Sequence, residues 1–149
     1  MSLQVRPMLP VDRSEVLYLL SMLTDGDRTA AQQALDTAFT EFWTADWGGA
    51  VAGVGALTVR PGRPIAEVEW LAVAPAFRRR GVASALLQSL QERCTQVGAR
   101  SLLVRTFHFN KPSLCCYIQN GFLPHHMLRD YFGTGRHGVC LVWERPSVE

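Results

Sequence analysis

The chain has 149 residues, 48% of them apolar, and a formal net charge of +2, which fits one domain with its own core and is too mild to indicate a nucleic-acid partner. No window approaches the roughly 20 consecutive apolar residues of a membrane helix, and the start lacks a signal-peptide pattern, so we expect a cytoplasmic protein with no membrane partner. Four cysteines without a Cys-x-x-Cys pair favour reduced thiols over disulfides or a metal site.

The first half of the chain is predicted to contain a strand, two helices and a β-hairpin. Residues 3–6 read as a short strand, and helical spacing of apolar residues covers 12–23. A second helix is expected over 29–42. Its apolar side would be formed by Ala30, Ala34, Leu35, Ala38 and Phe39. A Trp-Gly-Gly turn then joins predicted strands at 42–46 and 50–59.

The second half alternates strands and helices. The expected elements are a strand at 65–73, a helix at 80–97, a strand at 101–106, a helix at 112–120 and strands at 122–128 and 139–144. This order predicts an α+β fold in which residues 1–149 form a single domain. We expect a mixed, mostly antiparallel central sheet of about six to seven strands, with helices on both faces and a parallel pair at the helical crossover.

Three arginines, Arg78 to Arg80, stand where a helix is predicted to begin. Cations are disfavoured there, because the helix dipole places partial positive charge at the N-terminus. The arrangement becomes favourable if an anion binds the unpaired backbone N–H groups of the turn. Gly81 would let the chain approach a phosphate, and the small Ala83 would keep the next turn clear. The alternative is a solvated basic helix end.

The segment Arg78-x-x-Gly81-x-Ala83 follows the strand that ends at Val73, and it resembles the Arg/Gln-x-x-Gly-x-Gly/Ala signature of GNAT acetyltransferases. The resemblance implies that backbone amides of the turn bind the pyrophosphate of acetyl-CoA. It also implies that the backbone of Leu71 to Val73 pairs with the pantetheine arm. It further implies the fold of this family, which agrees with the predicted order of elements.

The segment from Asn110 to Phe122 resembles the Asn-x-x-Ala-x-x-x-Tyr-x-x-x-Gly-Phe segment of the same family, with Ser113 in place of the usual alanine. The two segments together indicate acetyl-CoA as co-substrate and no metal. The cofactor-binding residues implied by position are Leu71, Ala72, Val73, Arg78, Arg79, Arg80, Gly81, Val82, Ala83, Ser84, Asn110, Ser113 and Tyr117.

Acetyl transfer to an amine requires a base for the amine, a polarised carbonyl and a proton for the departing thiolate. Glu67 and Glu69 are two apart on a predicted strand and share a face. The family position favours Glu67 as the base, with Glu69 second, although both carboxylates could equally be solvated. The resemblance places Tyr117 opposite the CoA sulfur as the acid, whereas a lone tyrosine on a helix is more often a core residue. Backbone N–H groups of 71–73 would polarise the carbonyl, and direct transfer is expected.

The acceptor is left open by the sequence. Residues 128–133 resemble a segment that closes the acceptor pocket in several GNAT subgroups, and Trp70, Arg129 and Tyr131 are candidate substrate-binding residues. The pair His125-His126 is more simply an ordinary part of a hairpin. Cys115 and Cys116 are expected to be packing residues. A peptide, an amino acid, a polyamine and an aminoglycoside all stay possible acceptors.

The function predicted is N-acetyl transfer from acetyl-CoA to a primary amine of a small molecule or peptide. The alternative is a non-catalytic acyl-CoA sensor, against which the presence of both Glu67 and Tyr117 argues. Residues 133–138 match Gly-x-Gly-x-x-Gly, but they neither end a leading strand nor open a helix, so a hairpin loop is expected. A homodimer through an exposed C-terminal strand is a further expectation.

Overall fold

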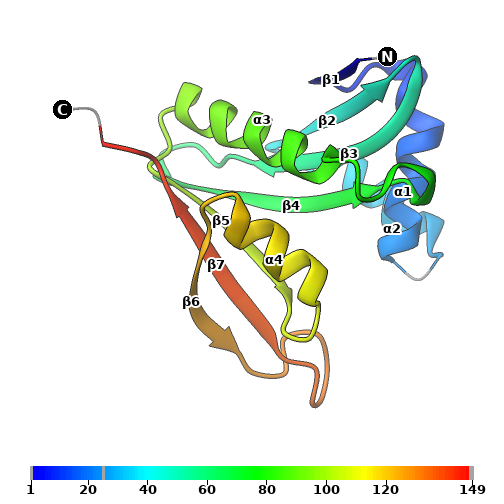
Figure 1. The fold of residues 1–149 in the computed structure, drawn as a ribbon. Helices are drawn as coiled ribbons and strands as arrows, with labels where there is room; N and C mark the ends of the chain where they lie inside the picture. Colours follow the sequence, from blue (N-terminus) through cyan, green and yellow to red (C-terminus); the bar gives the residue numbers. More distant parts are fainter. Residues whose placement is uncertain (1, 25, 148–149) are drawn as a thin grey trace.

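The computed structural model describes residues 2–24 and 26–147. Within them, strands form one sheet in the order β1-β2-β3-β4-β5-β7-β6 (Figure 1). The strands are β1 (Leu3–Pro7), β2 (Thr40–Trp47), β3 (Ala50–Thr58), β4 (Ile65–Val73), β5 (Ser101–Phe107), β6 (Leu123–Leu128) and β7 (Gly138–Glu144). The α-helices are α1 (Arg13–Leu23), α2 (Arg28–Leu35), α3 (Val82–Gln96) and α4 (Lys111–Gln119). Neighbouring strands run antiparallel except β4 and β5, so the predicted α+β sheet is confirmed.

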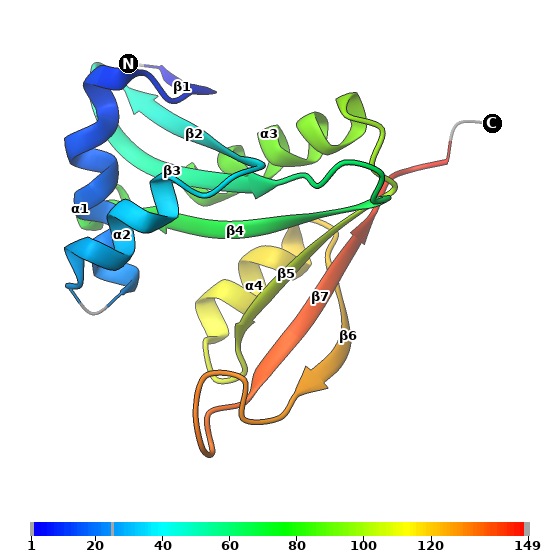
Figure 2. The ribbon, with the colours of Figure 1, turned by 180° about the vertical axis from the view of Figure 1, so that it is seen from behind.

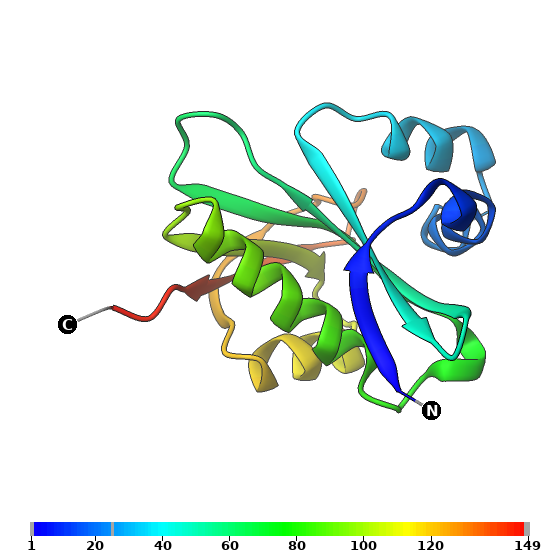
Figure 3. The ribbon, with the colours of Figure 1, turned by 90° about the horizontal axis from the view of Figure 1, so that it is seen from above.

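Helices cover both faces of strands β2 to β4. The helices α1 and α2 pack on one face, and α3 lies on the other, as Figure 3 shows from above. The face under α3 is lined by Gly53 and Gly55, and a Cβ atom at Gly53 would lie 2.9 Å from Val82 Cγ1. These two glycines therefore let α3 approach the sheet closely. No helix in the described part of the chain is long and apolar enough to cross a membrane.

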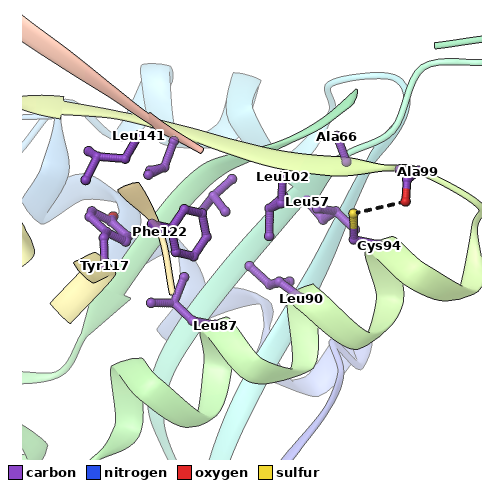
Figure 4. Close-up of a cluster of buried hydrophobic side chains, with 12 residues drawn as sticks. Leu57, Ala66, Leu87, Leu90, Cys94, Ala99, Leu102, Tyr117, Phe122 and Leu141 are labelled. Atoms are coloured by element: carbon purple, nitrogen blue, oxygen red, sulfur yellow. Dashed lines mark hydrogen bonds between the residues drawn. The ribbon is translucent and has the colours of Figure 1, made fainter. Parts of the chain in front are cut away.

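The largest core cluster joins α3, α4 and the strands around the parallel pair. Figure 4 shows Leu87 and Leu90 of α3 next to Phe122, while Tyr117 of α4 lies beside Phe122. Leu102 on β5 and Leu141 on β7 belong to the same cluster, and both are fully buried. This packing fixes α4 against the sheet and so places Tyr117.

The parallel pair β4–β5 is short. Pairing runs from Ile65 with Ser101 to Val68 with Val104, whereas β4 stays paired with β3 up to Val73. Beyond Val68 the two strands separate, and Figures 1 and 2 show β5 and β7 diverging from β4. The edge of β4 that faces away from β3 is therefore left without a neighbouring strand.

Two sequence-based expectations were wrong. The second helix ends at Leu35 and not near Phe42, because Thr40 begins a strand that pairs with Thr58. Phe39 adopts a left-handed conformation with φ 65° and is 57% exposed, so it belongs to no apolar helix side. The buried residues of α2 are Ala31 and Ala34. Ala30 and Ala38 are not among them.

The C-terminal strand is also not exposed at the edge of the sheet. It is β7, which pairs with β5 on one side and β6 on the other. The edge is formed by β6, whose residues 123–127 are exposed. The expectation of a homodimer through an exposed C-terminal strand therefore loses its basis. Residues 133–137 lie in the loop between β6 and β7, and Gly138 begins β7, so this segment leads into a strand and not a helix.

Candidate active site

A cavity of about 760 Å³ lies where β4 separates from β5, between the N-terminal part of α3 and α4. It is lined by all of the predicted cofactor-binding residues except Arg80: Leu71, Ala72, Val73, Arg78, Arg79, Gly81, Val82, Ala83, Ser84, Asn110, Ser113 and Tyr117. Three residues of α1 that the sequence analysis did not single out also contribute: Leu19, Met22 and Leu23. The structure thus brings two segments distant in sequence to one cavity.

The turn before α3 presents free backbone donors to this cavity. Gly81 is the N-cap with φ 81° and offers no side-chain cap, and the first backbone N–H that bonds back to it is that of Ala85 at 3.0 Å. Arg79 also lies in the left-handed region, with φ 61°. Non-glycine residues in this region are strained and cluster at ligand-binding sites. Uncapped amides and arginine side chains are groups that bind phosphate in proteins, and the turn brings both kinds to this cavity.

Arg80 points elsewhere. Its guanidinium carbon lies 5.8 Å from the ring centroid of Trp47 and 5.9 Å from that of Phe77. These are distances at which a cation interacts with an aromatic face. Of the three consecutive arginines, Arg78 and Arg79 line the cavity, and Arg80 packs on the aromatic residues beside it.

Tyr117 is both a core residue and a cavity residue. It is only 6% exposed, and its ring packs against Phe122 with centroids 5.6 Å apart. Burial raises the pKa of Tyr117 well above its usual value of about 10, so its hydroxyl is protonated at neutral pH. Cys115 and Cys116 line the same cavity as free thiols, which the expectation of simple packing residues did not include.

Two asparagines hold α4 in place. The Asn110 side chain accepts a hydrogen bond from the Ser113 N–H at 3.3 Å and so caps the helix. At the other end, the Asn120 amide donates to Ser84 Oγ at 3.1 Å and to the Cys116 carbonyl at 2.8 Å. Asn120 therefore links α4 to α3, a role that no sequence pattern had indicated.

Glu67 lies on the opposite face of β4 from the core residues Ala66 and Val68, and 23% of its side chain is exposed. It forms an ion pair with Arg105 of β5. Burial and the nearby charge of Glu69 raise the pKa of Glu67, and this outweighs the opposing effect of Arg105. The Arg105 guanidinium also lies 5.9 Å from the centroid of Tyr131. A single arginine within an otherwise uncharged strand is the signal that sequence analysis missed.

The other predicted residues lie apart from this pair. Glu69 is the extra residue of a β-bulge, since Val68 pairs with Leu57 and Trp70 with Ala56. Glu69 and Trp70 line a second cavity of about 270 Å³, against α2. Neither Glu67 nor Glu69 lines the larger cavity. Arg129 is exposed just after β6, and His125 and His126 are exposed within that strand.

No cluster of His, Cys, Asp or Glu side chains suited to a metal ion occurs within residues 2–24 and 26–147. The donor set of the larger cavity consists instead of backbone amides, arginines, hydroxyls and thiols. This set matches a phosphate-containing organic ligand better than a metal ion.

Solved structures of other proteins share this fold. An acetyltransferase of Bacillus subtilis in complex with CoA superposes with a TM-score of 0.82 and 22% identity, covering 96% of this chain and 99% of that one. A GNAT family acetyltransferase of Elizabethkingia anophelis with acetyl-CoA bound gives 0.77 and 19%, covering 95% and 97%. The ribosomal-protein-S18-alanine N-acetyltransferase of Escherichia coli gives 0.79 and 15%, covering 99% and 97%. At these identities the likeness concerns the fold alone.

Sequence comparison with curated proteins gives no significant match. The family model described as "Acetyltransferase (GNAT) family" matches residues 12–122, a span that includes both the arginine turn and the segment around Tyr117. Because the match covers most of the chain, the protein belongs to the GNAT family of acetyltransferases.

Proposed function

We propose that the protein transfers an acetyl group from acetyl-CoA to a primary amine of a small molecule or peptide. The observation that carries this proposal is the cavity at the separated β4 edge, where the uncapped start of α3 meets Tyr117. The cavity offers N–H groups that can bind phosphate, and it also offers the protonated hydroxyl of Tyr117. The donors would hold the co-substrate, and the hydroxyl would protonate the departing thiolate.

Acetyl-CoA fits this donor set. The amides at the start of α3, with Arg78 and Arg79, would hold the pyrophosphate. The unpaired edge of β4 at Leu71 to Val73 would offer backbone partners to the amide groups of the pantetheine arm. The Bacillus subtilis acetyltransferase in complex with CoA and the Elizabethkingia anophelis acetyltransferase with acetyl-CoA bound support this occupant. Bound acetyl-CoA would supply an activated acyl carbon as a thioester.

Glu67 would act as the base. An alkyl amine is mostly protonated at neutral pH, so it must lose a proton before its nitrogen can form the new C–N bond. The raised pKa of Glu67 brings this carboxylate closer to the working pH, which favours proton acceptance from the amine. The ion pair with Arg105 would hold the carboxylate in place at the point where β4 and β5 separate.

Tyr117 would act as the acid. As the C–S bond breaks, the sulfur needs a proton, and the buried Tyr117 hydroxyl is protonated at neutral pH. Backbone N–H groups on the free edge of β4 near Leu71 to Val73 would stabilise the negative charge on the carbonyl oxygen. The products would be an amide and free CoA. The proton lost by the ammonium before attack would be held by Glu67 until solvent removes it, and the second proton, lost from nitrogen once the C–N bond has formed, would restore the Tyr117 hydroxyl.

The test is acetyl transfer from acetyl-CoA to a pool of amines and peptides, read by mass spectrometry. We expect product with the wild type and a loss of about a hundredfold or more in kcat with Tyr117→Phe and with Glu67→Gln. A Tyr117→Phe variant keeps the ring that packs on Phe122, so an unchanged Tm would separate chemistry from folding. If acetyl-CoA raises the Tm but no pool member is acetylated, the sensor alternative replaces this proposal. If acetyl-CoA neither raises the Tm nor acetylates any pool member, the phosphate site itself is refuted.

A further inference from the structure

The smaller cavity lies between α2 and the bulge of β4, on the same face of the sheet as Glu67. Its volume is about 270 Å³, and it is lined by Ala30, Gln33, Ala34, Thr37, Thr40, Glu69 and Trp70. Sites for whole small-molecule ligands commonly measure roughly 300–1,000 Å³. A cavity of this size therefore suits one side-chain-sized group of a larger ligand.

The lining of this cavity carries one charge, and it is negative. Glu69 is exposed and takes part in none of the ion pairs of the described residues. The hydroxyls present are already engaged, since Thr37 donates to the Gln33 carbonyl at 3.0 Å and Thr40 bonds to Thr58 at 2.9 Å. The Glu69 carboxylate is thus left to bind a charged partner from outside the protein.

The other large group in the cavity favours the same kind of partner. Trp70 is the best of the aromatic side chains at attracting a cation to its face, and it adjoins Glu69 in both sequence and cavity. The Gln33 side chain adds a carbonyl acceptor, and no lysine or arginine lines the cavity. A carboxylate, an amide and an indole face together match an ammonium or guanidinium group.

The smaller cavity also lies close to Glu67, the proposed base. Glu69 is two residues from Glu67, which corresponds to roughly 7 Å along a strand, and the charge of Glu69 raises the pKa of Glu67. The two carboxylates therefore lie within electrostatic reach of each other. An acceptor with its reacting amine at Glu67 could place a second group at Glu69 through a short chain.

We infer that the Glu69–Trp70 cavity is an acceptor subsite for a second cationic group, so that the protein prefers acceptors bearing an ammonium or guanidinium a short chain away from the acetylated amine. This inference rests on the proposed acetyl transfer. A free diamine and the basic side chain of a peptide present the same chemistry, and the experiment distinguishes them.

The first measurement compares kcat/KM for matched acceptors. One pair is 1-aminopentane and 1,5-diaminopentane, and the other is the dipeptide amides Ala-norleucine and Ala-lysine. The wild type should prefer the cationic member of one pair by about tenfold, as expected for a charge-assisted contact, and the pair affected identifies the source. Equal use of both members in both pairs would overturn the inference while leaving acetyl transfer established.

Two pairs of variants locate the effect. Glu69→Gln should remove most of the preference, whereas Glu92→Gln, an exposed glutamate on α3, should keep it. Gln33→Lys should abolish the preference by placing a cation in the cavity. Gln32→Lys adds the same charge to the same helix, but Gln32 does not line the cavity. Equal behaviour of the two lysine variants would show that the cavity is not involved.

A binding measurement separates this inference from the proposed function. Calorimetry with 1,5-diaminopentane in the presence of CoA should show binding to the wild type and about tenfold weaker binding to Glu69→Gln. This result would support the subsite even if no acetyl transfer occurred. No heat of binding to the wild type, together with active transfer to 1-aminopentane, would refute the subsite and retain the enzyme.

Discussion

Arg105 of β5 forms an ion pair with Glu67 of β4 across the point where these two strands separate. The pair joins the two halves of the sheet on the face opposite the buried residues Val68 and Val104. It also controls the protonation of Glu67, because the guanidinium lowers the pKa of the carboxyl while burial and Glu69 raise it.

The pH dependence of kcat/KM should therefore respond to the charged groups around Glu67, of which Arg105 and Arg60 lower its pKa and Glu69 raises it. A base must be deprotonated, so activity rises with pH through the pKa of Glu67. Arg105→Gln removes a cation and should move this acidic limb to higher pH by about one unit. Glu69→Gln removes a like charge and should move the limb to lower pH. Using one monoamine acceptor throughout cancels the titration of the substrate. Coincident profiles for all three proteins would show that another group is the base.

The affinity for acetyl-CoA should distinguish two neighbouring arginines. Arg78 lines the large cavity, while Arg80 packs on Trp47 and Phe77. Arg78→Ala should raise the KM for acetyl-CoA by about tenfold, and Arg80→Ala by less than about threefold, although both remove one positive charge. The difference should shrink as ionic strength rises. Equal effects of the two variants would indicate a general electrostatic attraction instead of a phosphate contact.

The stability of the fold should depend on the missing side chain at Gly53. A Cβ atom there would lie 2.9 Å from both the Ala72 carbonyl oxygen and Val82 Cγ1, whereas at Gly55 the nearest atom is the movable Leu90 Cδ1 at 3.3 Å. Gly53→Ala should lower the free energy of unfolding by about 1–3 kcal/mol. Gly55→Ala should be nearly neutral. Urea denaturation measures both, and equal stabilities would mean that α3 can move away without cost.

The buried carboxylate of Asp12 should make the free energy of unfolding depend on pH in the acidic range. It bonds to Arg6 at 2.6 Å and to the Leu9 N–H at 2.8 Å, and these contacts lower its pKa. Its contribution is complete above the unfolded value of about 3.9 and is lost as pH falls through the lowered folded value. Asp12→Asn should cost about 2–3 kcal/mol at neutral pH and remove this loss.

The matched control for Asp12 is Asp36, whose pair with Arg13 is 3.8 Å long and largely exposed. Exposed pairs of this kind contribute little to stability. Asp36→Asn should therefore leave both the free energy of unfolding and its pH dependence unchanged. A similar loss of unfolding free energy in Asp12→Asn and Asp36→Asn would indicate that the change in net charge, and not the burial of Asp12, causes the effect.

The sequence predicted the features of the fold that a local pattern of residues determines. The glycine and arginines at Arg78 to Gly81 predicted the start of a helix, and α3 begins at Val82 with the turn lining the cavity; phosphate binding by this turn stays a prediction. The order of strands and helices predicted the mixed sheet with one parallel pair. Tyr117 could be placed on a helix because Pro112 and Gly121 mark its ends, and the structure has α4 over Lys111–Gln119 with Asn110 as its N-cap.

The remainder depends on contacts between distant segments. Residues 34–39 have helical apolar spacing, yet pairing of Thr40 with Thr58 ends the helix early. Asp12 is the N-cap of α1, but its carboxylate binds Arg6 and the Leu9 N–H and makes no bond to the helix amides. Arg105 gains its role through the register of β4 and β5, and the bulge at Glu69 through pairing with β3. No local pattern reports such registers.

The short pairing of β4 with β5 has a mechanical consequence. Four residue pairs, from Ile65–Ser101 to Val68–Val104, connect the strands β1 to β4 with β5 to β7. The cavity therefore belongs to neither half alone, because Leu71 to Val73 of β4 and residues of α4, which follows β5, both line it. A molecule that binds the free edge of β4 and α4 at once would link the two halves of the sheet. Its binding free energy would therefore add to the free energy needed to separate them.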